Sequence, residues 1–138
     1  MKLMVCYDDT SEAKDAVRLA QKHAKDWNAS IEVISTITRE EPLRHSQLQR
    51  MEDKFDAQIK DLFEDARDIA YNAQLLVDSL TSGEQLVKFA ARKLVDMMYI
   101  GIKKRSKVGK LLFGSTAQYI ILNATCPVVT VNGMNVGI

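Results

Sequence analysis

Short apolar runs alternate along the chain with longer segments in which apolar residues recur every three or four positions. The short runs contain many β-branched residues and are typical of strands that are buried in a parallel sheet. The longer segments have the spacing of one face of an amphipathic helix. The pattern predicts strands over residues 2–7, 31–38, 74–80, 97–100 and 127–131. It predicts a first helix that residues 8–11 cap and whose apolar face runs from Ala13 to Trp27, a second over residues 46–71, and further helices that begin near residues 82 and 115.

Two large side chains are expected to complete the buried faces of these helices. Trp27 ends the apolar face of the first helix, and Leu94 follows the inward positions of the third. The apolar stripe of the second helix continues without a break to Ile69 and Ala70, and this is why the helix is expected to reach Tyr71.

A strict alternation of strand and helix favours the α/β class. Right-handed crossovers then give a doubly wound, Rossmann-like sheet of five parallel strands with helices on both faces. Since the sequence shows no linker or repeat, residues 1–138 are predicted to form one domain. Ligands of such sheets bind beyond the carboxyl ends of the strands, where the strand order reverses. The first strand, which leads into Asp8, and the fourth, which leads into Gly101, are expected to meet at that point.

The overall charge excludes some classes of partner. Nineteen basic and 18 acidic side chains give a net charge of +1, which argues against nucleic acid or membrane binding driven by bulk charge. The apolar runs are far shorter than the roughly 20 residues that cross a bilayer. With no signal-peptide pattern at the N-terminus, a cytoplasmic location is expected. Cys6 and Cys126 are expected to be reduced and buried, and no structural zinc site is expected.

The segment between the fourth strand and the fourth helix carries the most chemistry. Gly101 ends the strand, and Gly114, Ser115 and Thr116 open the helix, where free N–H groups and two hydroxyls can hold an anion. Between them, residues 103–110 include five cations: Lys103, Lys104, Arg105, Lys107 and Lys110. The residue types alone leave two interpretations open, a polyphosphate site or a solvated basic loop with an ordinary helix cap.

This segment resembles the signature of the universal stress protein family, Gly-x2-Gly-x9-Gly-Ser/Thr. Gly101 matches its first glycine, and Gly114 with Ser115 matches its closing pair. The strand that ends in Asp8 and the segment from Ala124 to Val129 are also similar to the family pattern, so the resemblance covers nearly the whole chain.

The resemblance implies a stress-associated regulator that binds ATP, with or without Mg²⁺, or a related adenine nucleotide. It implies that Asp8 contacts the ribose or base, that Thr36 lies near the adenine, and that Gly101 lets the loop approach the phosphates. Gly114, Ser115 and Thr116 would hold phosphate oxygens. It further implies a homodimer formed through the last strand, at Val128, Val129, Thr130 and Val131.

Two positions depart from the family pattern. Lys104 stands at the second glycine, where its charge can approach a phosphate, and Asp9 stands where the family often has glycine. Two alternative functions therefore stay open. One is a homodimeric scaffold that binds no nucleotide, and the other is a slow Mg²⁺-dependent ATPase that uses the Asp8 side of the site.

Overall fold

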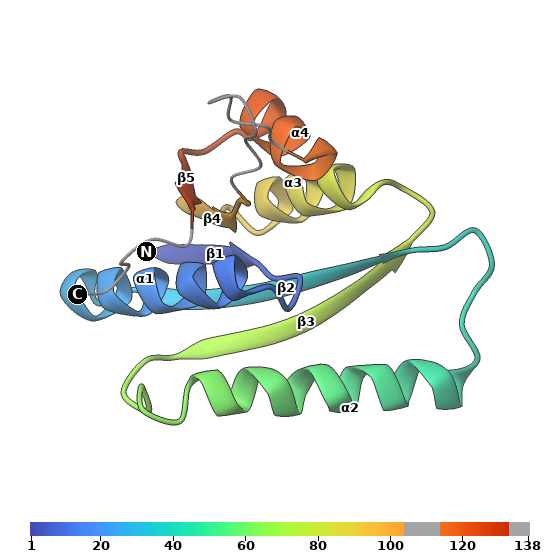
Figure 1. Ribbon diagram of the computed structural model, residues 1–138, viewed down its shortest axis with the longest axis horizontal. Coiled ribbons are helices and arrows are strands. Elements are labelled where there is room, and N and C mark those ends of the chain that lie inside the picture. The colour runs from blue at the N-terminus through green and yellow to red at the C-terminus, as the bar shows by residue number, and fades with distance from the viewer. Residues whose placement is uncertain (104–113, 133–138) are drawn as a thin grey trace.

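The structure is a computed structural model that describes residues 1–103 and 114–132. Helices and strands alternate along the chain, as the sequence pattern predicts (Figure 1). The strands are β1 (Lys2–Cys6), β2 (Ser30–Thr38), β3 (Tyr71–Asp78), β4 (Met97–Gly101) and β5 (Val128–Val131). The helices are α1 (Ser11–Trp27), α2 (His45–Leu62), α3 (Ser82–Arg92) and α4 (Ser115–Asn123).

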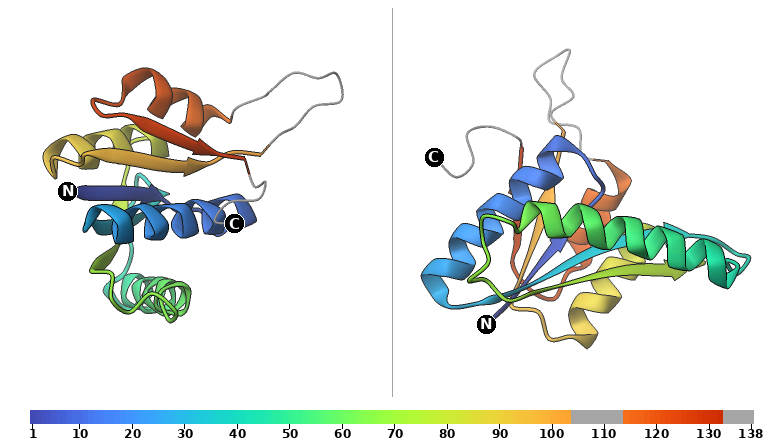
Figure 2. Two further views of the ribbon diagram at one scale, coloured as in Figure 1. Left: turned by 90° about the vertical axis from the view of Figure 1, so that its left-hand side faces the viewer. Right: turned by 90° about the horizontal axis from the view of Figure 1, so that it is seen from below.

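The strands form one parallel sheet in the order β3-β2-β1-β4-β5. Helices α1 and α2 cover one face of the sheet, and α3 and α4 cover the other (Figure 2). The predicted doubly wound α/β fold is therefore confirmed. The strand order reverses at β1, because the chain builds β2 and β3 on one side of β1 and then returns to place β4 on the other.

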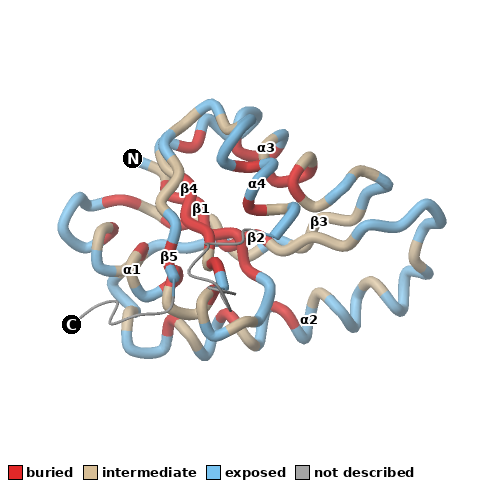
Figure 3. Tube along the Cα trace, turned by 45° about the horizontal axis from the view of Figure 1, so that its top comes forward, coloured by how far each residue is buried: buried red, intermediate tan, exposed pale blue. Residues whose placement is uncertain are grey.

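Two apolar clusters hold the layers together, one on each face of the sheet. The first packs β1, β2 and β4 side chains against the alanine-rich face of α1 and against Phe55 and Ile59 of α2. The second packs the opposite sides of these strands against α3 and α4 around Phe89, Met98 and Ile120. Burial is concentrated in the centre of the sheet, while β3 and the first half of α2 extend away from it with few buried residues (Figure 3).

The prediction that the second helix reaches Tyr71 is wrong. Helix α2 ends at Leu62, and β3 begins at Tyr71, three residues before the predicted strand start. The intervening chain makes tight turns, in which the N–H of Ala66 bonds to the carbonyl of Phe63 and that of Ile69 to Ala66, at 3.0 and 3.1 Å. Such turns repeat every three residues, so they place apolar side chains inward at nearly the spacing of an α-helix.

Trp27 and Leu94 are not core residues, which corrects both predictions. Trp27 is 43% exposed and stacks on the ring of His23, with ring centroids 4.4 Å apart. Leu94 is 81% exposed and adopts a left-handed conformation with φ of 54°. The N–H of Val95 bonds to the carbonyl of Ala90 and that of Leu94 to Ala91. This pair of bonds is the Schellman motif, so Leu94 belongs to the helix end and not to the inward face.

Candidate functional site

A cleft of about 940 Å³ opens above the carboxyl ends of β1, β2 and β4. Its size lies in the range of small-molecule sites, roughly 300–1,000 Å³. The residues that line it come from the β1–α1 turn, the end of β2, one flank of α2, and the starts of α3 and α4. Six residues that the sequence singles out are among them: Asp8, Thr36, Gly101, Gly114, Ser115 and Thr116. Lys104 lies outside the described residues.

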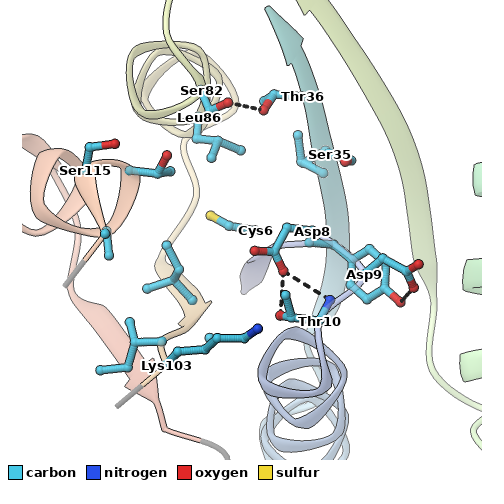
Figure 4. A pocket seen from close by; sticks show the side chains of 18 of the residues that line it. Cys6, Asp8, Asp9, Thr10, Ser35, Thr36, Ser82, Leu86, Lys103 and Ser115 are labelled. Carbon is cyan, nitrogen blue, oxygen red and sulfur yellow. Dashed lines mark hydrogen bonds between the residues drawn. The ribbon is translucent and has the colours of Figure 1, made fainter. Parts of the chain in front are cut away.

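Asp8 lies between the start of α4 and the end of β2 (Figure 4). Its Oδ1 accepts hydrogen bonds from the hydroxyl of Thr10 at 2.6 Å and from the backbone N–H of Thr10 at 3.3 Å. The Thr10 hydroxyl in turn accepts from the N–H of Ala13, at 3.1 Å, and so caps α1. The helix cap therefore fixes the orientation of the Asp8 carboxylate, and no described residue donates a hydrogen bond to its Oδ2.

Asp9 occupies a backbone conformation that favours glycine. Its φ is 62°, in the left-handed region, which explains physically why glycine suits this position. The carboxylate accepts a hydrogen bond from the Tyr7 hydroxyl at 3.1 Å and lies 3.9 Å from the Lys14 ammonium. Burial, with the bond to Asp9 as a smaller cause, raises the pKa of Tyr7, so Tyr7 stays protonated and donates this bond.

Gly101 is required by the fold. A Cβ atom placed there would lie 2.4 Å from the carbonyl carbon of Glu12 and 2.6 Å from the backbone nitrogen of Ala13. The first turn of α1 thus rests directly on the end of β4, and this contact sets the position of the α1 start beside the cleft. Because Gly101 also lines the cleft, close packing is the first reason for a glycine here, ahead of any contact with a ligand.

None of the described residues requires a glycine at position 114. A Cβ atom placed there would meet no described atom within 4 Å. Gly114 is the N-cap of α4 and makes no side-chain capping bond, and the first residues of this helix line the cleft, so their N–H groups lie beside it. Ser115 and Thr116 add hydroxyls beside these N–H groups, and Lys103 adds a positive charge to the lining. Free N–H groups, hydroxyls and a cation are the partners that a phosphate group binds.

The end of β2 is joined to the start of α3 on the other side of the cleft. The Thr36 hydroxyl donates a hydrogen bond to the Ser82 hydroxyl at 2.8 Å, as Figure 4 shows. The hydroxyl donor of Thr36 is thereby used within the protein. Apolar side chains lie close to this bond in the sequence, since Ile34 precedes Thr36 on β2 and Leu86 follows Ser82 on α3, and both line the cleft, as does Phe55 of α2. This end is therefore suited to a flat apolar group with a polar edge.

Cys6 lies in the lining as an unreactive thiol. Burial raises its pKa to about 12, with smaller contributions from the charges of Cys126 and Asp8. Cys6 is buried and Cys126 half-buried, and both are free. The expectation that both thiols are buried is confirmed for Cys6 and is wrong for Cys126.

Several lining residues were not expected from the sequence. Ser35 lies in the second half of β2 and Ser82 opens α3, both at the carboxyl edge of the sheet, so the rule that placed Asp8 at the site could also have indicated them. Phe55 and Gln58 could not be found in this way, because they lie within α2 and reach the cleft only through its packing against the sheet.

No cluster of three or more acidic, histidine or cysteine side chains that could hold a metal ion occurs in residues 1–103 and 114–132. None of the described helices is long and apolar enough to span a membrane.

The strand order and the cleft beside β1 and β4 define a doubly wound α/β protein with a cleft at the topological switch point, where ligands of such sheets bind. The model of the Universal stress protein family matches residues 1–132, and the chain belongs to this family. Among curated proteins, no sequence matches this chain.

Solved structures agree with this assignment. A universal stress protein from Archaeoglobus fulgidus is 24% identical, with a TM-score of 0.79, and the match covers 96% of this chain and 98% of that one. The structure of the universal stress protein from the same organism in complex with dAMP is 20% identical over the same shares, with a TM-score of 0.76. A family protein from Arabidopsis thaliana with AMP bound is 14% identical over 96% of this chain and 91% of that one, with a TM-score of 0.63. At these identities the likeness is one of fold.

Proposed function

We propose that this protein binds ATP or a related adenine nucleotide in the cleft and acts as a nucleotide-dependent regulator. One observation carries the proposal: the space at Gly114, which no described atom fills and where the uncapped start of α4 lines a cleft large enough for a nucleotide. The described part of the fold does not need a glycine at this position, whereas a phosphate that approaches the backbone closely favours one. Structures of similar fold that contain dAMP or AMP support the same reading.

The cleft suggests how a nucleotide would lie. Phosphate oxygens would accept hydrogen bonds from the N–H groups and hydroxyls at Gly114, Ser115 and Thr116, with Lys103 nearby. Lys104 would add positive charge to the phosphates. The base would occupy the apolar end near Thr36, and Asp8 would accept from a ribose hydroxyl between the two ends. Mg²⁺ would be held mainly by the phosphates of the nucleotide.

Thermal unfolding with added nucleotide tests this proposal. A ligand that binds only the folded state stabilises it by RT ln(1 + [L]/Kd), about 2.7 kcal/mol at a hundred times Kd. We expect ATP with Mg²⁺ to raise Tm progressively with concentration. Ribose 5-phosphate, which lacks the base, should raise Tm much less. An unchanged Tm up to millimolar ATP would contradict nucleotide binding and favour the scaffold alternative.

We also propose that two copies pair through β5. This strand pairs only with β4 among the described residues. Its odd-numbered residues face β4, since the carbonyls of Pro127 and Val131 accept bonds from Met98 and Ile102. Val128 and Thr130 therefore present their N–H and C=O groups to the unpaired edge. Helix α4, which leads into β5, exposes Ile121 and Leu122.

Sedimentation equilibrium tests the proposed dimer. The wild type should have twice the mass of one chain, 15.5 kDa. Thr130→Pro removes an N–H from the free edge but none from the β4 pairing, so it should shift the equilibrium towards the monomer and keep the fold. A monomeric wild type would rule the dimer out.

We also propose a cytoplasmic location for this protein, which the two free thiols support because disulfides are rare in the cytoplasm.

A further inference from the structure

Several polar side chains line the cleft near β2, and two of them are already hydrogen-bonded within the protein. The donor of the Thr36 hydroxyl is directed to Ser82, and Asp9 accepts from Tyr7. Gln58 differs from both. It lines the cleft from α2, is half-buried, and its side-chain amide has no hydrogen-bond partner among the described residues. A half-buried amide that faces a cleft without a partner is available to a ligand.

The position of Gln58 is set by the apolar face of α2. Phe55 and Ile59 are buried against the sheet, and the Phe55 ring packs against Tyr7 with ring centroids 6.2 Å apart. Gln58 lies one turn after Phe55, between these two anchors in the sequence, so its Cα is held by the packing of the helix core. Phe55 supplies an apolar surface in the same part of the cleft. An apolar ring with a nearby amide is a combination that recognises a nucleobase.

The amide of glutamine matches adenine in particular. Its carbonyl accepts a hydrogen bond, and its NH2 group donates one. Adenine presents its N6 amino donor directly beside a ring nitrogen acceptor, and a glutamine side chain can make both bonds at once. We propose that Gln58 reads the adenine N6 amino group and the adjacent ring nitrogen, and so selects the base of the nucleotide. This inference rests on the proposed nucleotide binding and adds the residue that determines base specificity.

Paired titrations of protein variants and ligand variants test the role of Gln58. The ligands are ATP and purine ribonucleoside triphosphate, which carries hydrogen in place of the N6 amino group, and both are titrated calorimetrically with Mg²⁺. The wild type should bind ATP about tenfold more tightly, since one hydrogen bond to the base is lost with the second ligand. Gln58→Leu should bind the two ligands about equally, because neither base then has a partner.

Two further variants make the result specific. Gln58→Glu keeps an acceptor for the N6 amino group, so it should retain the preference for ATP while binding more weakly. Gln49→Leu is the same substitution on the same helix at an exposed residue whose amide donates to Asp53, and it should keep the wild-type preference.

The outcomes separate this inference from the proposed function. A wild type that binds both ligands with equal affinity, or a Gln58→Leu variant that keeps the full preference for ATP, would overturn the role of Gln58 and leave nucleotide binding intact. A folded wild type that binds neither ligand would overturn both.

Discussion

The two glycines that frame the cleft are predicted to respond in opposite ways to the same substitution. At Gly101 an added Cβ would lie 2.4 Å from the carbonyl carbon of Glu12, about 1 Å inside ordinary van der Waals contact. The obstructing atoms are backbone atoms of a helix, so no side chain can rotate away to make room. The first turn of α1 would have to move away from β4.

The expected cost follows from this geometry. Overpacking a close-packed interior costs about 1–3 kcal/mol, and a clash with backbone belongs at the upper end of that range. A loss of about 3 kcal/mol is a large part of the roughly 5–15 kcal/mol that stabilises a domain, and at this chain length it lowers Tm by about 10 °C. Gly114→Ala is the matched control. Since no atom of residues 1–103 and 114–132 lies within 4 Å of its added Cβ, its Tm should stay within about 2 °C of the wild type.

Thermal and urea unfolding, followed by circular dichroism, measure both variants. A Gly101→Ala variant that unfolds within 2 °C of the wild type would refute the reasoning about close packing. A Gly114→Ala variant as unstable as Gly101→Ala would show that Gly114 also serves the fold, and would remove the observation on which the proposed phosphate site rests.

Three other predictions follow from the described residues. Leu94→Gly should stabilise the protein by about 1 kcal/mol in urea unfolding, because it relieves a left-handed backbone conformation at a residue that is 81% exposed. The control Leu122→Gly, at an equally exposed residue within α4, should destabilise the protein by about the same amount. Burial raises the pKa of Tyr99 from 10.0 to about 12, so as pH rises the unfolded chain loses this proton before the folded protein does. The stability of the fold should therefore decrease between pH 10 and 12, and Tyr99→Phe should flatten this part of a plot of Tm against pH. At pH 8 iodoacetamide should modify Cys126 well before Cys6, since burial both shields Cys6 and raises its pKa to about 12; equal rates would contradict the placement of Cys6 beneath the cleft.

Local signals in the sequence were sufficient wherever one element is determined by its own residues. The Thr81–Glu84 segment predicts the start of α3, and the structure shows a capping box there, with the Thr81 hydroxyl accepting from the N–H of Glu84 at 3.3 Å. The short apolar runs of β1 and β4 are likewise a local signal, and both strands were predicted to within one residue. Asp8 and Gly101 were expected at one edge of the sheet from the strand order alone, and the structure places both in the lining of the cleft.

The errors arise where tertiary packing decides. The periodicity of residues 63–69 does not distinguish an α-helix from successive tight turns, so the end of α2 was placed too late. Leu94 fits the spacing of the α3 stripe, but the Schellman motif turns it outward. Gln58 carries no signal in the sequence at all. Its place in the cleft depends on how α2 packs across the sheet, which no local pattern records.

The central claim is that a nucleotide places its phosphates at the start of α4, and one calorimetric titration tests it most directly. ATP with Mg²⁺ is titrated into the wild type and into Gly114→Trp, whose indole would occupy the open space in front of the α4 N–H groups. We expect saturable binding to the wild type, and no binding to the variant although it unfolds at the same temperature. Equal affinity of the two proteins would contradict the phosphate site, and absence of binding to the folded wild type would contradict nucleotide binding altogether.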